Sequence, residues 1–398
     1  MSELVTRELE AQAIAWRRHL HAHPELSFSE HETSAFLFEL IGGTEGVELE
    51  RPTETSVVAY LRTGRPGPTL ALRADIDALP IEEETGLEFA SQTPGVMHAC
   101  GHDGHTAMLL AAFNALHERR DELTGEIRFI FQHAEELLPG GARDLVRAGV
   151  MDGVDLVVGA HLFSLDELGK VGVLAGPHTA AADLFTIEIR GRGGHGAAPH
   201  KAVDPITAAA QIVTGLQHVV SRVVDPIERA VVSVCTMHGG TAGNVIPETV
   251  ELGGTVRTFT PEMRATVREA MERFVHGIAE AHGATATLSY EEGYAPVVND
   301  EQACAFVEAA VRAELGDDAF FVPKPIMGGE DFSAYLQATP GAFFIVGAGG
   351  EGNFPHHHPR FDWDESAMRN GIAVFVRLAL DYLAPERAEL AAASATAR

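Results

Sequence analysis

Residues of the types that can bind metal ions follow the ends of several apolar segments in this sequence. Asp75 and Asp77 follow one such segment, Glu135 and Glu136 follow a second, and His161 ends a third. Two further runs add histidines and a cysteine, namely MHACGHDGH at 97–105 and HHH at 356–358. This density of imidazole, thiolate and carboxylate groups suits a borderline metal such as zinc or manganese.

Each of these residues has an ordinary explanation when it is taken alone. A histidine beside an apolar strand, such as His161, is more often a core or surface residue than a ligand. Cys100 alone is more often a small buried hydrophobe. Glu135 and Glu136 resemble a solvated helix start, and the run 356–358 resembles a solvated loop. These explanations must hold independently at five places, so the metal site is the stronger interpretation.

The composition of the site indicates hydrolysis. Thiolate and imidazole groups hold a cation, and a carboxylate ligand limits its net charge. Two ions together can bridge one water and lower its pKa far below that of bulk water. A carboxylate beside that water, not bound to metal, takes its proton and passes it to the leaving amine. Neighbouring Glu135 and Glu136 can divide these tasks, one as base and one as ligand.

The segments that position these residues predict an α/β sheet. Four apolar runs predict buried strands, at Thr69–Ala74, Glu126–Gln132, Asp155–Ala160 and Ala342–Val346. Helical patterns lie at Glu8–Glu25, Glu32–Leu40, Thr106–Arg119 and Gly141–Ala148. Alternating strands and helices are typical of α/β domains. In such open sheets, ligands bind beyond the carboxyl ends of the strands, which is where the candidate residues fall.

The pattern changes between about Asp183 and Glu292. Strand and helix signals follow there in the order β-α-β-β-α-β, at Leu184–Arg190, Asp204–Val220, Val231–His238, Glu251–Phe259, Pro261–His282 and Ala284–Tyr290. This order is the ferredoxin-like plan. We therefore expect a catalytic domain in two parts, residues 1–182 and 293–398, with an inserted domain at 183–292.

Length, charge and cysteine usage exclude several classes of protein. At 398 residues the chain exceeds what one hydrophobic core usually supports, which agrees with two domains. A formal net charge of −28 disfavours nucleic acid or an anionic membrane as partner. The N-terminus has no signal-peptide pattern, and no apolar run approaches the roughly 20 residues of a membrane span. Three scattered cysteines argue against a disulfide framework. These features predict a cytoplasmic protein with free thiols.

One competing motif is the GxGxxG pattern at Gly191–Gly196, which is the fingerprint of dinucleotide-binding proteins. His195 within the motif would crowd a pyrophosphate, and Pro199 follows at once. No acidic residue ends a second strand at the expected distance. A nucleotide site is therefore the weaker interpretation of this segment.

The sequence resembles the M20 metallopeptidases, and among them the aminoacylases, hippurate hydrolases and auxin-conjugate hydrolases. The matching blocks span nearly the whole chain, and they are RHLHAHPE at 18–25, LRADIDALP at 72–80, MHACGHDGHT at 97–106, AEE at 134–136, GAH at 159–161, GH at 194–195, GNVIP at 243–247, GTVR at 254–257 and GGEDF at 328–332. The resemblance implies a mixed-sheet, zinc-peptidase-like α/β catalytic domain. It further implies that the inserted ferredoxin-like α+β domain is a lid that also dimerises.

The resemblance assigns the metal site residue by residue. It implies two divalent ions per subunit, zinc or manganese first and cobalt or nickel next, held by Cys100, His102, Glu136, His161 and His357. The late ligand of the family stands two residues before a proline, which selects His357 over His356 and His358. Glu135 matches the general base of the family.

The resemblance also assigns residues around the metal site. His195 resembles a lid histidine that stabilises the oxyanion, often in the active site of the partner subunit. Asn244 and Arg257 are the expected groups that bind the substrate carboxylate, Arg257 through a bidentate fork. Asp75 or Asp103 is expected to orient the ligand histidines.

The expected activity is hydrolysis of an N-acyl-L-amino acid to a carboxylic acid and a free amino acid, by a homodimer or a dimer-based oligomer. A dipeptidase or an N-acetyl-diaminopimelate deacetylase would share every ligand and differ in the lining of the pocket. A non-catalytic metal-binding protein and a nicotinamide enzyme are rivals from other classes. His133 stands where the family usually has proline, which leaves the metal preference open.

Overall fold

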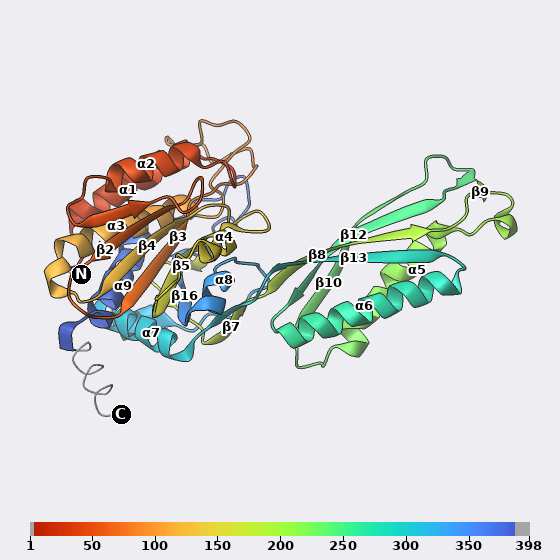
Figure 1. Ribbon diagram of the computed structural model, residues 1–398. Helices are drawn as coiled ribbons and strands as arrows, with labels where there is room; N and C mark the ends of the chain where they lie inside the picture. The colour runs from red at the N-terminus through yellow and green to blue at the C-terminus, as the bar shows by residue number, and fades with distance from the viewer. Residues whose placement is uncertain (1–3, 387–398) are drawn as a thin grey trace, which may run out of the picture. The chain divides into compact units, whose positions relative to one another are not determined.

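The computed structural model describes residues 4–386, which form two compact units (Figure 1). Unit 1 takes in the described residues up to Gly176, Val298–Lys324, and those from Asp331 onward. Unit 2 consists of Pro177–Val297 and Pro325–Glu330. The segment 183–292, expected from sequence as an inserted domain, lies inside unit 2. Unit 2 is longer than that segment. It also includes most of the short strand β7 (Gly176–Thr179) and the separate segment Pro325–Glu330.

Unit 1 contains a mixed sheet of eight strands. In sheet order they are β1 (Val47–Glu50), β2 (Val57–Arg62), β4 (Glu126–Gln132), β3 (Thr69–Asp75), β5 (Leu156–Glu167), β16 (Gly341–Gly349), β6 (Val171–Gly172) and β15 (Phe320–Phe321). The neighbours β4, β3, β5 and β16 run parallel, whereas β1 and β2 are added antiparallel. The predicted mixed α/β sheet is confirmed.

The parallel strands of unit 1 are buried on both faces. Every residue of β3 after Thr69 is buried, which explains its continuous apolar run. Strand β5 extends beyond the predicted end at Ala160, because its pairing with β16 continues through His161 and Leu162. His161 therefore lies inside β5 and interrupts its apolar run without ending the strand.

The helices of unit 1 are α1 (Arg7–Ala22), α2 (His31–Ile41), α3 (His102–Glu118), α4 (Gly141–Arg147), α7 (Glu301–Leu315), α8 (Ser333–Ala338) and α9 (Ala367–Tyr382). Helices α1, α3, α9 and α7 pack in series, and α4 packs on α8. Helix α3 begins four residues before the predicted Thr106, because Gly101 adopts a φ of 92° and turns the chain into the helix. Among residues 4–386, no helix has both the length and the apolarity needed to cross a bilayer.

Unit 2 has the ferredoxin-like order of elements. They are β8 (Ala181–Arg190), α5 (Pro205–His218), β10 (Ala230–Gly239), β12 (Thr249–Thr258), α6 (Pro261–Ala281) and β13 (Thr285–Tyr294). The strands form an antiparallel sheet in the order β10-β12-β8-β13, and α5 packs on α6 (Figure 1). Buried residues of both helices and of the sheet, such as Ile187, Ile212 and Val275, form a separate core.

Candidate metal centre

The predicted ligands of unit 1 gather at one place although they come from four parts of the chain. Cys100 and His102 flank the start of α3, Glu136 follows β4, His161 lies in β5, and His357 lies between β16 and α9. Ligand atoms of Cys100, His102 and His161 all lie within 4.8 Å of one another, and so do those of Cys100, Glu136 and His357. Cys100 belongs to both groups, so the two clusters are adjacent.

Hydrogen bonds fix the tautomers of two of the histidines. Nδ1 of His102 lies 2.9 Å from the backbone oxygen of Asp77 and 3.2 Å from its Oδ1 atom. Nδ1 of His161 lies 2.7 Å from the backbone oxygen of Leu162. Oxygen atoms without hydrogens require N–H at Nδ1, so in the neutral form of each ring Nε2 is the nitrogen that has a free lone pair. Nε2 of His161 points to Sγ of Cys100 at 3.5 Å. Metal-binding histidines are oriented in this way.

Two buried atoms at the cluster lack a hydrogen-bond partner among the described residues. They are Nε2 of His102 and Oε1 of Glu136, which lie 3.8 Å apart. Oε1 of Glu136 is also 3.2 Å from Nε2 of His357. Buried polar groups are normally hydrogen-bonded, and an unpaired one requires an explanation such as an ion. Imidazole, thiolate and carboxylate are the ligands that zinc prefers, so these residues fit a divalent cation.

The charges at the cluster also favour a cation. Burial, together with the carboxylates of Glu136 and Glu135, raises the pKa of the Cys100 thiol well above its ordinary value. Burial opposes protonation of His102, but the carboxylates of Asp75, Asp77 and Glu136 outweigh it and raise the pKa of His102 to about 10. The protein thus concentrates negative charge in a buried place. A bound divalent ion would neutralise that charge and stabilise the thiolate.

Glu135 lies beside the ligands. Its carboxylate is within 4.8 Å of ligand atoms of His102 and Glu136, and the residue is buried. Ala134 precedes it with a φ of 50°, a left-handed conformation that is uncommon for a residue with a Cβ atom. At this turn the chain leaves the direction of β4, and both glutamates that follow lie at the cluster.

Two aspartates at the carboxyl end of β3 contact the histidines of the cluster, Asp75 as the last residue of the strand and Asp77 just after it. Asp75 accepts a hydrogen bond from Nδ1 of His105 at 2.7 Å and lies 3.7 Å from Nε2 of His102. Asp77 contacts Nδ1 of His102 and accepts a hydrogen bond from the backbone N–H of Glu136 at 3.0 Å. Sequence reasoning placed Asp77 with Asp75 after the first strand but gave it no role in orienting a ligand. Its spacing from Asp75 was the available signal, because alternate residues of an extended chain share a face.

Asp103, the other aspartate expected to orient a ligand, lies in a different network. It accepts a hydrogen bond from Nε of Arg17 at 2.8 Å and contacts Nδ1 of His21 at 2.9 Å. Helix α3 starts at His102, so consecutive side chains point in different directions, and Asp103 faces α1. The structure therefore assigns the orientation of His102 to Asp77 in place of Asp103.

The three consecutive histidines of the late loop have different surroundings. Nε2 of His356 donates to the backbone oxygen of Leu162 at 2.9 Å. Nδ1 of His358 accepts a backbone N–H two residues later at 3.0 Å. His357 has a φ of 64°, and its Nε2 atom belongs to the group with Cys100. The geometry thus favours His357 among the three.

His133 packs beside the cluster. Its ring contacts the edge of Phe28 with centroids 5.6 Å apart, and its Nδ1 atom lies 3.4 Å from Oγ1 of Thr53. Burial lowers the pKa of its imidazole. Among the described residues, His133 belongs to none of the groups that could hold an ion. It acts here as a packing residue.

The remaining predicted residues belong to unit 2, where His195 and Asn244 are neighbours. His195 is exposed on β9 (Gly194–His195), which pairs with β11 (Val245–Ile246). Nδ1 of His195 accepts the backbone N–H of Ala197 at 3.0 Å, so Nε2 carries the proton and can donate it in a hydrogen bond. The backbone oxygen of Asn244 accepts from the N–H of Gly196 at 2.8 Å.

Arg257 lies on β12, in the four-stranded sheet of unit 2. It pairs with Ala182, whereas Thr249 at the start of β12 pairs with Arg190. These eight steps along β12 correspond to about 26 Å at roughly 3.3 Å per residue. Strand β9 lies beyond the Thr249 end of β12 (Figure 1). Within one copy of unit 2, His195 and Arg257 are therefore too far apart to contact one small substrate.

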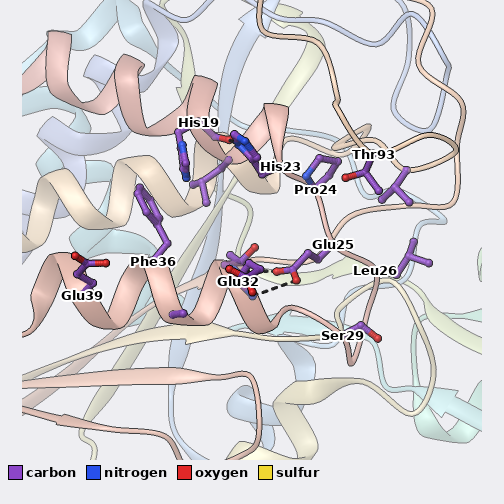
Figure 2. Close-up of a pocket in the computed structure, with 14 residues that line it drawn as sticks. His19, His23, Pro24, Glu25, Leu26, Ser29, Glu32, Phe36, Glu39 and Thr93 are labelled. Atoms are coloured by element: carbon purple, nitrogen blue, oxygen red, sulfur yellow. Dashed lines mark hydrogen bonds between the residues drawn. The ribbon is translucent and has the colours of Figure 1, made fainter.

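A pocket of about 720 Å³ lies elsewhere in unit 1, along α1 and α2 (Figure 2). His19, His23 and Phe36 line one side, and Glu25 accepts two backbone N–H groups at the start of α2. None of the candidate ligands lines this pocket. Its size alone does not make it the chemical site.

Comparisons with known proteins agree with the geometry. The family model described as peptidase family M20/M25/M40 matches residues 71–381. An N-acyl-L-amino acid amidohydrolase of Geobacillus stearothermophilus is 57% identical over 74% of this chain and 80% of its own length. An N-acetyl-L-cysteine deacetylase of Bacillus subtilis is 44% identical over 90% and 85%. The crystal structure of the Bacillus subtilis protein YXEP, a dinuclear metal binding peptidase from the M20 family, matches with a TM-score of 0.84 and 39% identity over 95% and 99%. The chain therefore belongs to peptidase family M20/M25/M40.

Proposed function

We propose that this protein is a metal-dependent amidohydrolase that cleaves N-acyl-L-amino acids to a carboxylic acid and a free amino acid. The observation that carries the proposal is two buried atoms of the cluster that make no hydrogen bond among the described residues, Nε2 of His102 and Oε1 of Glu136, with the Glu135 carboxylate beside them. The similarity to an N-acyl-L-amino acid amidohydrolase and to an N-acetyl-L-cysteine deacetylase supports the choice of substrate class.

The residues that would hold two divalent ions are Cys100, His102, Glu136, His161 and His357. Cys100 belongs to both ligand groups, so its sulfur is placed to serve either ion or both. Ions bound there would lower the pKa of a water molecule and polarise the amide carbonyl. We propose zinc or manganese, because thiolate and imidazole suit the first and the carboxylates suit either.

Glu135 performs the proton transfers in this proposal. Its carboxylate takes a proton from the attacking water and delivers it to the nitrogen of the leaving amino acid. Glu136 is the neighbouring ligand, and both glutamates follow the left-handed turn at Ala134. Burial keeps bulk water away from Glu135, so the proton passes between the reacting groups.

Unit 2 supplies the remaining groups in this proposal, and it acts as a lid and a dimerisation domain. Nε2–H of His195 donates a hydrogen bond to the oxyanion that develops on the carbonyl. Arg257 and Asn244 are the proposed carboxylate-binding residues. Because His195 lies on β9, beyond the Thr249 end of β12, and Arg257 lies near the other end of β12, one substrate meets both only if two subunits contribute. This separation supports a homodimer in which His195 acts across the subunit boundary.

The base assignment is tested by Glu135→Gln. We expect the variant to bind wild-type amounts of metal by elemental analysis and to lose at least 10³-fold in kcat, roughly the contribution of a general base. Substrates are N-acetyl-methionine, hippurate and a dipeptide, each assayed with zinc, manganese, cobalt and nickel. Wild-type turnover in the variant would refute the role of Glu135. A dipeptide that is hydrolysed faster than either acyl amino acid would refute the substrate class.

The dimer proposal has a separate test. Inactive Glu135→Gln and inactive His195→Ala subunits are mixed, unfolded together and refolded. If His195 acts across the boundary, hybrid dimers contain one site with both residues intact, and activity reappears. Absence of activity in hybrids that form by mass analysis would place His195 in its own subunit or outside the reaction.

A further inference from the structure

A buried carboxylate on a different element contacts the backbone just before Glu135. Glu30, at the start of α2, has no exposed surface. Its Oε1 atom accepts the backbone N–H of Ala134 at 2.8 Å and that of Phe28 at 3.0 Å. Its Oε2 atom accepts the hydroxyl of Thr55 at 2.8 Å. The side chain thus joins three separate segments.

Two of those contacts involve unusual backbone conformations. Ala134 has a φ of 50° and Phe28 has a φ of 64°, and left-handed conformations persist in such residues only when the surroundings hold them. The Ala134 oxygen accepts the N–H of Gly141 at 3.0 Å, and Asp77 accepts the N–H of Glu136 at 3.0 Å. Ala134 is thus held through its oxygen by Gly141 and through its N–H by the carboxylate of Glu30.

We propose that Glu30 is a positioning residue for the reaction, which fixes the Ala134 turn and thereby the place of the Glu135 carboxylate. The proposal rests on the proposed function, because Glu135 is the base there. Glu30 reaches the cluster through Ala134 and is not itself a ligand, since it belongs to none of the groups of described residues that could hold an ion.

The contacts predict which substitutions keep this role. Glutamine has the same length, so its carbonyl oxygen can accept both backbone N–H groups while its NH₂ donates to the Thr55 oxygen. Aspartate keeps the charge but is shorter by one methylene, so its oxygens cannot reach Ala134 and Thr55 together. If the positions of the hydrogen-bonding atoms matter, glutamine at position 30 preserves activity better than aspartate. If the negative charge of Glu30 matters, aspartate preserves activity better than glutamine.

A matched control comes from the same loop. Glu25 accepts the backbone N–H groups of Glu32 and Thr33 at 3.1 and 2.8 Å, so Glu25→Ala weakens the start of α2 without touching the bond to Ala134 (Figure 2). A loss of activity caused only by loosening of this segment would appear in Glu25→Ala as well.

The experiment compares Glu30→Gln, Glu30→Asp and Glu25→Ala with wild type, all loaded with the same metal and assayed on N-acetyl-methionine. We expect kcat of Glu30→Asp to fall roughly 10–100-fold, as for a displaced catalytic group, with KM and metal content unchanged. We expect Glu30→Gln and Glu25→Ala to keep kcat within about threefold. Hydrogen–deuterium exchange of metal-free protein supplies a readout apart from activity, because the peptide that contains Ala134 should exchange faster in Glu30→Asp only.

The outcomes separate the two proposals. Equal kcat in Glu30→Asp and wild type, a better rate in Glu30→Asp than in Glu30→Gln, or an equal loss in Glu25→Ala would overturn the positioning role. Unchanged exchange around Ala134 in Glu30→Asp would overturn it as well. If wild type hydrolyses none of the acyl amino acids while exchange changes as expected, the proposed function fails and the structural role of Glu30 stands.

Discussion

Asp77→Asn tests how the ligand histidine is held. Oδ1 of Asp77 faces Nδ1–H of His102 at 3.2 Å, and Oδ2 accepts the N–H of Glu136 at 3.0 Å and the hydroxyl of Ser27 at 2.7 Å. Asparagine has one oxygen and one NH₂ group. In either orientation of the amide, its NH₂ group therefore faces another N–H donor, on His102 or on Glu136.

The magnitude follows from that mismatch. A buried donor without an acceptor costs about 1–3 kcal/mol, and 1.4 kcal/mol is about tenfold in an equilibrium constant. The mismatch falls on a ligand in both orientations, because it rotates His102 or displaces the backbone of Glu136. Substitutions behind metal ligands typically weaken binding about 10–100-fold. We therefore expect the metal dissociation constant to rise by about that factor.

The assay is calorimetric titration of metal-stripped protein with zinc, alongside thermal unfolding of the same samples. Asp103→Asn is the matched control, because Asp103 is equally buried but contacts Arg17 and His21. We expect this control to lower the melting temperature and to leave zinc affinity within about threefold of wild type. Wild-type affinity in Asp77→Asn, or an equal loss in Asp103→Asn, would refute the assignment.

Three further predictions concern stability and metal dependence. Asp183 is buried in unit 2 and accepts hydrogen bonds from Arg264 at 2.7 Å and Tyr290 at 2.6 Å, so Asp183→Asn should lower the free energy of unfolding by roughly 3 kcal/mol in denaturant titrations. Burial opposes protonation of His21, but its hydrogen bond to Asp103 helps raise its pKa above 6.5; the stabilisation is complete below that value and is lost as pH rises through the raised pKa. The difference in melting temperature between wild type and His21→Gln should therefore be larger at about pH 6 than at about pH 9, and an equal difference would contradict the shift. Treatment with a chelator should abolish activity and lower the melting temperature, and added zinc or manganese should restore both.

The sequence predicted the elements and the gathering of ligands because both depend on local patterns. Buried parallel strands produce continuous apolar runs, as in Glu126–Gln132, where prediction and structure agree residue for residue. Polar residues at the carboxyl ends of such strands necessarily share one edge of the sheet. Cys100, just before α3, and His357, in the loop after β16, also come together, although more than 250 residues separate them.

Contacts between side chains of distant segments were not predictable in the same way. Asp103 is next to a candidate ligand in sequence, yet the direction of the helix turns it toward Arg17. Glu30 lies about 100 residues from Ala134, and no periodicity links the two. The left-handed turn at Ala134 has no glycine to indicate it. Such contacts depend on how elements pack, which a single sequence does not encode locally.

The backbone N–H and C=O of Leu162 connect three histidine rings. Its N–H donates to Nε2 of His105 at 2.9 Å, and its oxygen contacts Nδ1 of His161 at 2.7 Å and Nε2 of His356 at 2.9 Å. Every amino acid except proline offers the same N–H and C=O groups. Mutational tolerance at position 162 is therefore set by the volume available to the buried side chain, while the orientation of the rings is insensitive to its chemical identity. Replacing Leu162 by another apolar residue of similar size should therefore leave the orientation of the three rings unchanged.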